Sequence, residues 1–230
     1  MSQLIDNLNT IESVKTDIKS AIENKGVDMT GVSFPGYASK IGEISGGSGW
    51  DQKSFTEGTV EIINLDNSAS FVASNAFNGD INIQTVNLLY ATSVGNSAFY
   101  GCSLLSQVSL PVCSYIGNYA FESCSSLSQM SLPVCSYIGD YVFHNCSSLF
   151  QVSLPVCSYI GAYAFQNCTS LSIITIGYSS VCSLGSDAFY NTRITSSTGR
   201  IYVPASLVSA YKSATNWSYF SAIIQSYPGL

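Results

Sequence analysis

The stretch that decides the fold is residues 124–143, which read Cys-Ser-Ser-Leu-Ser-Gln-Met-Ser-Leu-Pro-Val-Cys-Ser-Tyr-Ile-Gly-Asp-Tyr-Val-Phe. Nearly the same series stands one copy earlier, over residues 102–121, and one copy later, over residues 146–165. One phenylalanine per copy marks the period: Phe77, Phe99, Phe121, Phe143 and Phe165, with Phe189 two residues late. Self-similarity at a fixed period, here about 22 residues, is typical of a solenoid, in which every repeat forms one coil.

Each repeat predicts one short strand, such as residues 108–110, whose alternate side chains point into the coil. A stack of about six coils buries a continuous core that a single coil cannot bury. The inward columns are Ile83, Leu105, Leu127, Leu149, Leu171; Val86, Val108, Met130, Val152, Ile174; Leu88, Leu110, Leu132, Leu154, Ile176; and Val94, Ile116, Ile138, Ile160, Leu184. A glycine follows the last column, at Gly95, Gly117, Gly139, Gly161 and Gly185. We expect a tight bend with positive φ there.

The residues that alternate with the inward columns must lie on the outer face of the sheet. They are uncharged, and nearly all carry an amide or a hydroxyl group. This outer ladder consists of Thr85, Gln107, Gln129, Gln151, Ile173 and Asn87, Ser109, Ser131, Ser153, Thr175. The simpler interpretation of such a face is a solvated sheet that polar residues keep non-adhesive. The alternative is a face that hydrogen-bonds a carbohydrate or a protein loop. Two tyrosine columns elsewhere on the coil favour packing between coils. They are Tyr115, Tyr137, Tyr159 and Tyr119, Tyr141, Tyr163.

Seven of the eight cysteines recur every 11 residues, which is half the repeat. They form the columns Cys102, Cys124, Cys146, Cys168 and Cys113, Cys135, Cys157, with Cys182 out of phase. This spacing predicts small, buried, reduced side chains, and disulfides between coils are the alternative. No metal site or cofactor is expected, because there is no Cys-x-x-Cys motif and only one histidine.

That histidine, His144, occupies a repeat position held by Glu122 and Gln166 in the neighbouring copies. A position that accepts all three residues predicts a solvated edge. A pair with Cys146 would lack an orienting carboxylate, and no phosphate loop, dinucleotide fingerprint or zinc-protease helix motif occurs. The sequence therefore predicts a protein that is not an enzyme.

The amino-acid composition also limits the classes of binding partner that we expect. Only 10% of the residues are charged, against about 25% in an ordinary soluble domain. Residues 54–192 contain no Lys or Arg but several acidic residues, so this region repels phosphate groups. Nucleic acid and anionic membranes are not expected partners. No apolar run approaches the roughly 20 residues that span a bilayer, and the N-terminus lacks the pattern of a secretory signal.

The spacing Leu-x-x-Val-x-Leu-Pro followed by Ile-Gly-x-x-Ala-Phe, as in residues 105–111 and 116–121, resembles the BspA-like class of leucine-rich repeats. That class occurs on surface adhesins of anaerobic bacteria, in some parasitic protists and in bacteriophage proteins. The resemblance implies an α/β repeat solenoid over residues 50–192. The following residues 193–230 look like the strand-and-helix cap that ends such arrays, with Pro204 in the first helical turn and Leu207, Val208 and Tyr211 as its buried stripe.

The N-terminal residues 1–44 predict a separate helical segment, joined to the repeats by a Gly/Ser linker at residues 45–49. Its apolar seam comprises Leu4, Leu8, Ile11, Ile18 and Ile22, with Lys15 in one core position. A short intermolecular bundle, with a homotrimer preferred, is one interpretation. A single amphipathic helix that packs on its own domain is the other.

The N-terminal segment also resembles the leaders of tail and fibre proteins in phages and prophages, on residues 25–27, 33–37 and 40–44. This resemblance implies a virion fibre or fibre-tip protein, docked on other virion proteins through residues 1–44. Its repeat domain would then bind a glycan or protein of the host surface. The alternatives are a bacterial cell-surface adhesin and an intracellular interaction scaffold, and the attachment role rests on the resemblance alone.

Overall fold

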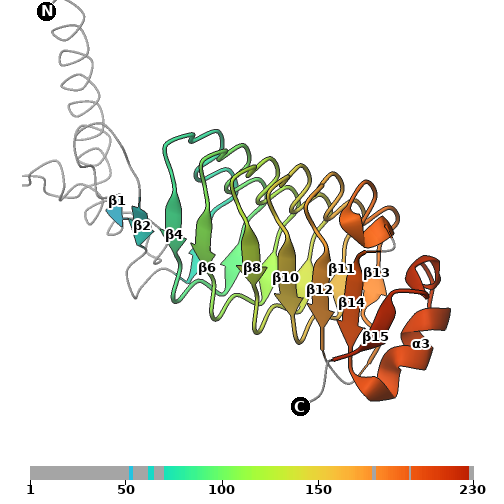
Figure 1. The fold of residues 1–230 in the computed structure, drawn as a ribbon. Coiled ribbons are helices and arrows are strands. Elements are labelled where there is room, and N and C mark those ends of the chain that lie inside the picture. The colour runs from blue at the N-terminus through green and yellow to red at the C-terminus, as the bar shows by residue number, and fades with distance from the viewer. Residues whose placement is uncertain (1–51, 54–61, 65–69, 178–179, 197, 228–230) are drawn as a thin grey trace, which may run out of the picture.

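The computed structural model describes residues 52–53, 62–64, 70–177, 180–196 and 198–227. The chain winds into a stack of coils that ends on a small helical cap (Figure 1). Each complete coil contributes two short strands and one turn. The sequence predicted one strand per coil. The second strand exists because each Tyr-Ile pair hydrogen-bonds in parallel with its counterpart in the neighbouring coil, as Tyr137 does with Tyr115 and Tyr159.

The first side of the coils carries the predicted strands. They are β1 (Gln52–Lys53), β2 (Ile62–Asn64), β4 (Thr85–Asn87), β6 (Gln107–Ser109), β8 (Gln129–Ser131), β10 (Gln151–Leu154), β12 (Ile173–Ile176), β14 (Arg200–Val203) and β15 (Ile224–Ser226). They form two sheets, ordered β1-β2-β4-β6 and β8-β10-β12-β14-β15, and β6 lies against β8. All neighbours are parallel except β1 and β2. Parallel pairing is what the repeat demands, because equivalent residues run in the same direction in every coil.

The second side carries the two-residue strands of one six-stranded parallel sheet. Its members are β3 (Phe71–Val72), β5 (Ser93–Val94), β7 (Tyr115–Ile116), β9 (Tyr137–Ile138), β11 (Tyr159–Ile160) and β13 (Ser183–Leu184). The pairing advances by one repeat period per coil until Tyr159 pairs with Ser183. The late Phe189 therefore reflects two residues added within the last coil.

The third side consists of turns, which are held by main-chain hydrogen bonds between coils. In each of five successive turns, which begin at Asn75, Ser97, Tyr119, Tyr141 and Tyr163, three N–H groups at alternate residues donate to carbonyl groups of the next coil. One such set joins Tyr141 to Ala162 at 3.0 Å, Phe143 to Ala164 at 2.7 Å and Asn145 to Gln166 at 2.9 Å. The first and third donors of the set lie in the left-handed region, with φ of 58° at Tyr141 and 61° at Asn145. The interlocked turns hold this unusual conformation.

The structure corrects the prediction for the glycine column. Gly95, Gly117, Gly139, Gly161 and Gly185 do not have positive φ; of the described glycines, only Gly79 and Gly101 do. The reason for glycine is a close approach between coils. A Cβ atom on Gly117 would lie 2.9 Å from the main-chain nitrogen of Asn96 in the preceding coil. The column therefore sets the distance between neighbouring main chains.

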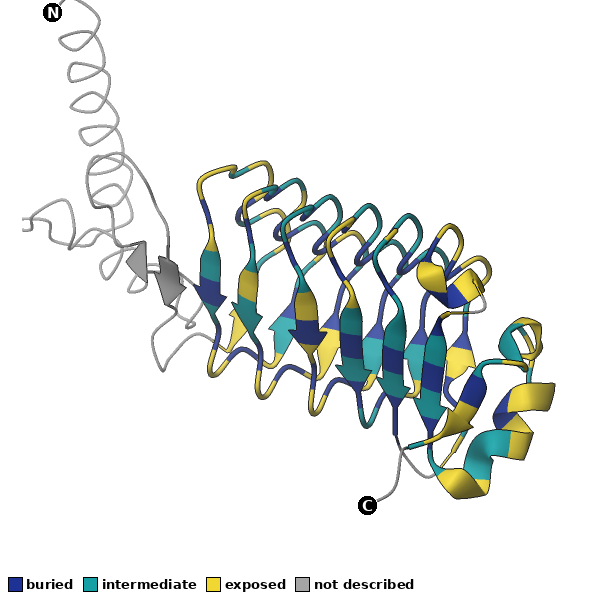
Figure 2. Ribbon diagram, viewed as in Figure 1, coloured by how far each residue is buried: buried dark blue, intermediate teal, exposed yellow. Residues whose placement is uncertain are grey.

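The core runs along the stack as continuous columns (Figure 2). The inward side chains predicted from the sequence are buried, except that Val108 is only partly buried. Beside them the repeat phenylalanines stack nearly parallel, with ring centroids 5.2 Å apart for Phe99 and Phe121 and 5.6 Å apart for Phe121 and Phe143. Each coil thus covers the apolar edge of its neighbour, as solenoid packing requires.

The C-terminal cap closes the last coil. It contains the 3-10 helices η2 (Arg193–Thr195), η3 (Ala205–Leu207) and η4 (Ser218–Phe220), the helix α3 (Val208–Ser213), and the strands β14 and β15. The predicted strand and helix are confirmed, and η3 begins directly after Pro204. Tyr211 is buried as predicted, but Leu207 and Val208 are only half-buried, because the short helix presents one turn to the core.

The predicted N-terminal helix, its seam and the linker at residues 45–49 lie outside the described residues. Within the residues that the structure describes, no helix is long and apolar enough to cross a membrane.

Candidate binding surface

The outer ladder lies on the first side of the coils, where strand register aligns its residues. Gln129 pairs with Gln151 and Ser131 with Ser153, while Thr85 pairs with Gln107 on the neighbouring sheet. The structure places all ten ladder residues outside the core: Gln107, Gln129 and Ser131 are exposed, and the other seven are half-buried. The alternation of outward polar and inward apolar residues is what the sequence predicted.

The glutamine side chains of this ladder are not used in hydrogen bonds within the described part of the protein. Among the described residues, the side chains of Gln107, Gln129 and Gln151 form no hydrogen bond with another protein group. Each amide offers two N–H donors and a carbonyl acceptor. Gln129 and Gln151 lie on paired strands of one sheet, and Gln107 lies on β6, the edge strand of the adjoining sheet that contacts β8. The three equivalent amides therefore belong to successive coils and retain their hydrogen-bonding capacity.

The rings of the two tyrosine columns stack between coils. One column lies on the strands of the second side, and the other, Tyr119, Tyr141 and Tyr163, lies in the turns of the third side. The centroids of Tyr115 and Tyr137 lie 4.9 Å apart, and those of Tyr119 and Tyr141 lie 5.0 Å apart. The predicted packing between coils is confirmed. Because each inner ring is covered on both faces, these columns expose mainly ring edges and hydroxyl groups.

Beside the tyrosine columns, a row of side-chain oxygens accepts hydrogen bonds from main-chain N–H groups of the next coil. The side-chain oxygen of Asn118 accepts a hydrogen bond from the Asp140 N–H at 2.9 Å, and that of Asp140 accepts from the Ala162 N–H at 2.8 Å. The side-chain oxygen of Asn96 likewise accepts a hydrogen bond from the Asn118 N–H. These groups stabilise the stack, whereas the glutamine amides of the first side remain available to a ligand.

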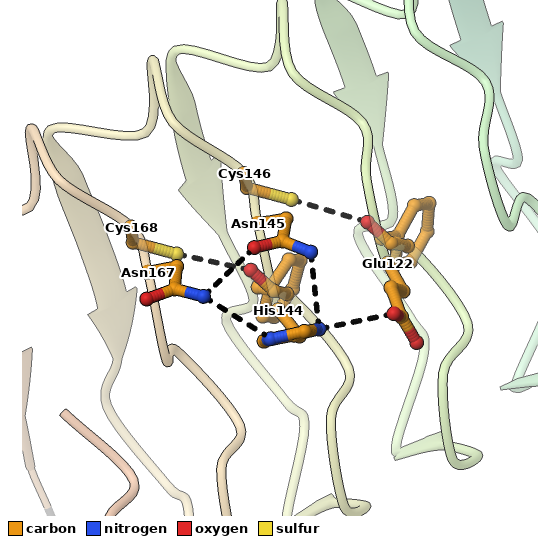
Figure 3. A network of polar contacts seen from close by, with 8 residues as sticks. Glu122, His144, Asn145, Cys146, Asn167 and Cys168 are labelled. Carbon is orange, nitrogen blue, oxygen red and sulfur yellow. Dashed lines mark hydrogen bonds and ion pairs between the residues drawn. The ribbon is translucent and has the colours of Figure 1, made fainter. Parts of the chain in front are cut away.

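His144 is not the solvated edge residue that the sequence predicted. Its side chain is 18% exposed and lies in a polar network between three coils (Figure 3). Its Nδ1 atom is 3.0 Å from Oε1 of Glu122, and its Nε2 atom is 3.4 Å from the amide nitrogen of Asn167. The ring of Tyr141 packs edge-on at 5.5 Å. Within one repeat copy, Glu122 and His144 are alternatives at the same position, whereas stacking of the coils makes them neighbours. The contact is therefore not visible in the pattern of a single repeat.

The cysteine columns are interior. All eight cysteines are buried free thiols. The four of the first column, Cys102, Cys124, Cys146 and Cys168, donate to a phenylalanine carbonyl of the preceding coil, as Cys146 does to Phe121 at 3.1 Å (Figure 3). Burial raises the pKa of Cys113 to about 11 and raises the pKa of Cys146 further. Cys182 contacts Cys157 despite its different phase, and their hydrogen bond lowers the pKa of Cys157 and raises that of Cys182. Buried, protonated thiols are poor nucleophiles.

The described part of the chain contains no group of three His, Cys, Asp or Glu side chains that could hold a metal ion. The predicted oligomerisation residues fall outside the described ranges; they are Leu4, Leu8, Ile11, Ile18 and Ile22.

Parallel coils with a repeating leucine column, an asparagine-rich turn and a terminal cap define a leucine-rich repeat solenoid. More narrowly, the model of the BspA type leucine rich repeat region matches residues 50–156 and 136–222, in 6 copies. The chain therefore belongs to the BspA type leucine-rich repeat family.

Solved structures agree with this assignment. A leucine-rich repeat protein of T. pallidum is 26% identical, with a TM-score of 0.50 over 56% of this chain and 75% of that protein. A leucine-rich cell surface protein of Faecalibacterium prausnitzii A2-165 is 21% identical, with a TM-score of 0.50, and is similar in fold. The match covers 70% of this chain and 53% of that protein, which is about half its length. A search of curated proteins finds no match.

Proposed function

We propose that this protein is a non-catalytic attachment protein whose outer ladder binds an uncharged, hydroxyl-bearing ligand, namely a glycan of a host surface. The observation that carries the proposal is the row of amides at Gln107, Gln129 and Gln151, on the adjoining strands β6, β8 and β10, whose side chains form no hydrogen bond within the described residues. Amide groups donate to and accept from hydroxyl groups, and the serine hydroxyls of the next column extend the same chemistry. The absence of Lys and Arg from residues 54–192 makes an anionic ligand unfavourable.

The main-chain pairing of the ladder strands supports this role. The ladder residues sit on strands whose main chains are hydrogen-bonded to neighbouring coils, so little main-chain ordering accompanies binding. A periodic row of identical groups also suits a ligand that itself repeats, because each coil can make the same contact.

A glycan array probed with the full chain tests the ligand class. Replacing Gln107, Gln129 and Gln151 together by Ala should weaken binding to a positive glycan at least tenfold and leave the unfolding midpoint nearly unchanged. Gln166→Ala, which removes the same amide from the turn side, is the matched control. Glycan binding that survives the triple substitution would place the ligand elsewhere, and an array without any binder would favour a protein loop as ligand.

The second part of the proposal concerns the particle or cell on which the protein is displayed. The resemblance of residues 1–44 to phage fibre leaders supports a virion fibre or fibre-tip protein docked through that segment. Family membership also fits a bacterial cell-surface adhesin. Antibodies against residues 50–230 distinguish the two: labelling of purified phage particles supports the virion, whereas labelling of intact bacteria that release no particles supports the adhesin.

A further inference from the structure

The last turn of the solenoid carries residues that differ from those of the preceding coils. The N–H of Tyr163 donates to the carbonyl of Ser186, so the next residue, Asp187, occupies the position that a tyrosine holds in the three preceding coils. Three residues later, Tyr190 occupies the position of Gln166. Both Asp187 and Tyr190 are exposed. The column of stacked tyrosine rings on the turn side therefore ends on an accessible carboxylate.

A cavity of about 590 Å³ lies between this turn and the cap. Asp187 and Tyr190 line it from the turn, and Tyr219 and Phe220 line it from the cap. Tyr190 and Tyr219 are 59% and 85% exposed, and within the described residues neither ring packs against another aromatic ring. The volume falls in the range of small-molecule sites, about 300–1,000 Å³. Accessible aromatic surface and a carboxylate are thus available to one ligand.

The charge of the cavity indicates the charge of its ligand. Asp187 is the one charged residue among those that line it. Within the described part of the chain, its carboxylate forms no ion pair and accepts no hydrogen bond. An anionic ligand would be repelled by this group, and a neutral apolar ligand would cover it without compensating its charge. The lining therefore favours a cation.

We propose that this cavity binds a quaternary ammonium group, such as that of choline, against the rings of Tyr190 and Tyr219 and beside the carboxylate of Asp187. Aromatic ring faces attract cations, and quaternary ammonium groups are recognised in this way. Their methyl groups suit the half-buried apolar lining at Phe220 and Ile223, and they require no hydrogen-bond acceptors. A calcium or magnesium ion would require several oxygen ligands, whereas Asp187 supplies the only carboxylate of the lining.

The site and its ligand differ from those of the outer ladder, so either proposal can fail without the other. The test is isothermal titration calorimetry of the full chain with choline chloride, at an ionic strength held constant with sodium chloride. The matched probe is the neutral alcohol in which a carbon atom replaces the nitrogen of choline. We expect this alcohol to bind at least tenfold more weakly than choline. The triple ladder variant should bind choline as wild type does.

Asp187→Asn should weaken choline binding at least tenfold, because it removes the charge and keeps the size of the side chain. Asparagine tolerates the φ of 52° at this position, so the unfolding midpoint should stay close to that of wild type. Asp80→Asn removes the same charge close to the first described turn, at the other end of the stack. This control should bind choline as wild type does.

Tyr219 separates a ring contact from a hydroxyl contact. Tyr219→Leu should weaken choline binding at least fivefold, whereas Tyr219→Phe keeps the ring and should bind nearly as tightly as wild type. Equal losses in these two variants would overturn the proposal. So would choline binding that Asp187→Asn leaves unchanged, equal binding of choline and the neutral alcohol, or no binding at tens of millimolar choline.

Phosphatidylcholine vesicles identify the molecule that carries the bound group once choline binding is established. Sedimentation of the wild-type chain with these vesicles, reduced at least tenfold by Asp187→Asn, would support a lipid head group as ligand. Choline binding without sedimentation would support a quaternary ammonium group on a soluble molecule or a glycan.

Discussion

The indole N–H of Trp217 donates a hydrogen bond to the carbonyl of Cys182 at 2.6 Å. The N–H of the same cysteine donates to the hydroxyl of Tyr211 at 2.9 Å. Two aromatic residues of the cap thereby satisfy both main-chain groups of one residue in the last coil. Trp217 and Tyr211 are fully buried and pack edge-on at 5.1 Å. The cap is therefore fixed to the solenoid by polar contacts inside an apolar cluster, where an unpaired group would be costly.

Trp217→Phe should destabilise the protein, because the Cys182 carbonyl loses its donor while remaining buried. We expect the free energy of unfolding to fall by about 1–3 kcal/mol, measured by urea denaturation and circular dichroism. Tyr219→Phe is the control, since Tyr219 is 85% exposed and its hydroxyl should matter by less than about 0.5 kcal/mol. Equal losses in the two variants would contradict a specific role for the indole hydrogen bond.

Leu132→Ala should cost about 2–5 kcal/mol, because this residue is fully buried and coils on both sides limit collapse of the cavity. Gln129→Ala, three residues earlier on the exposed face, should change the free energy of unfolding little. Both values come from denaturant unfolding of the full chain. If Gln129→Ala were as damaging as Leu132→Ala, the assignment of inward and outward positions would be wrong.

Gly117→Ala should destabilise the stack by about 1–3 kcal/mol through overpacking. The added Cβ atom would lie 2.9 Å from the main-chain nitrogen of Asn96, and main chain cannot move aside as a side chain can. Gly79→Ala is an informative comparison, because Gly79 has φ of 75° but open space around its Cβ position. Its cost should arise from the backbone conformation alone. Thermal unfolding of the two variants and wild type gives both values.

The stability of the protein should fall at high pH. Burial raises the pKa of Cys113 to about 11 in the folded protein, against 9.0 for an ordinary thiol. As the pH rises above 9, the unfolded chain loses this proton first, so the free energy of unfolding decreases between about pH 9 and pH 11 and is unaffected below pH 9. Urea denaturation across this range should show a shallower decline for Cys113→Ala than for wild type. An identical decline would show that Cys113 does not contribute.

The full chain should form a homo-oligomer, with a trimer preferred, through Leu4, Leu8, Ile11, Ile18 and Ile22. A chain beginning at Trp50 should be monomeric, because it lacks this apolar seam. Lys15 is compatible with such a bundle if its ammonium group extends to solvent. Light scattering at tens of micromolar measures both chains. A monomeric full chain would reject self-assembly and leave docking of residues 1–44 onto another protein as their role.

The sequence alone was sufficient for the repeat, the inward columns and the exposed ladder, because burial in a stacked coil follows directly from the period. Leu132 and Gln129 are an example: they lie three positions apart, in β8 and directly after it, and the structure buries Leu132 while it exposes Gln129. The cap strand and the short helix near Tyr211 were also predictable, since the apolar pattern changes from the repeat to a helical spacing.

Only the tertiary structure decided how residues of different coils act on one another. Gly117 is required by the main chain of the preceding coil, and His144 is enclosed by Glu122 and Asn167 from the coils on either side. The main-chain N–H of Phe189, unlike that of Phe165, has no acceptor among the described residues, because no further turn follows it. The repeat pattern determines whether a position faces inward or outward within one coil. The spacing between coils and the closure at the end depend instead on contacts between segments a full repeat or more apart, which no local pattern encodes.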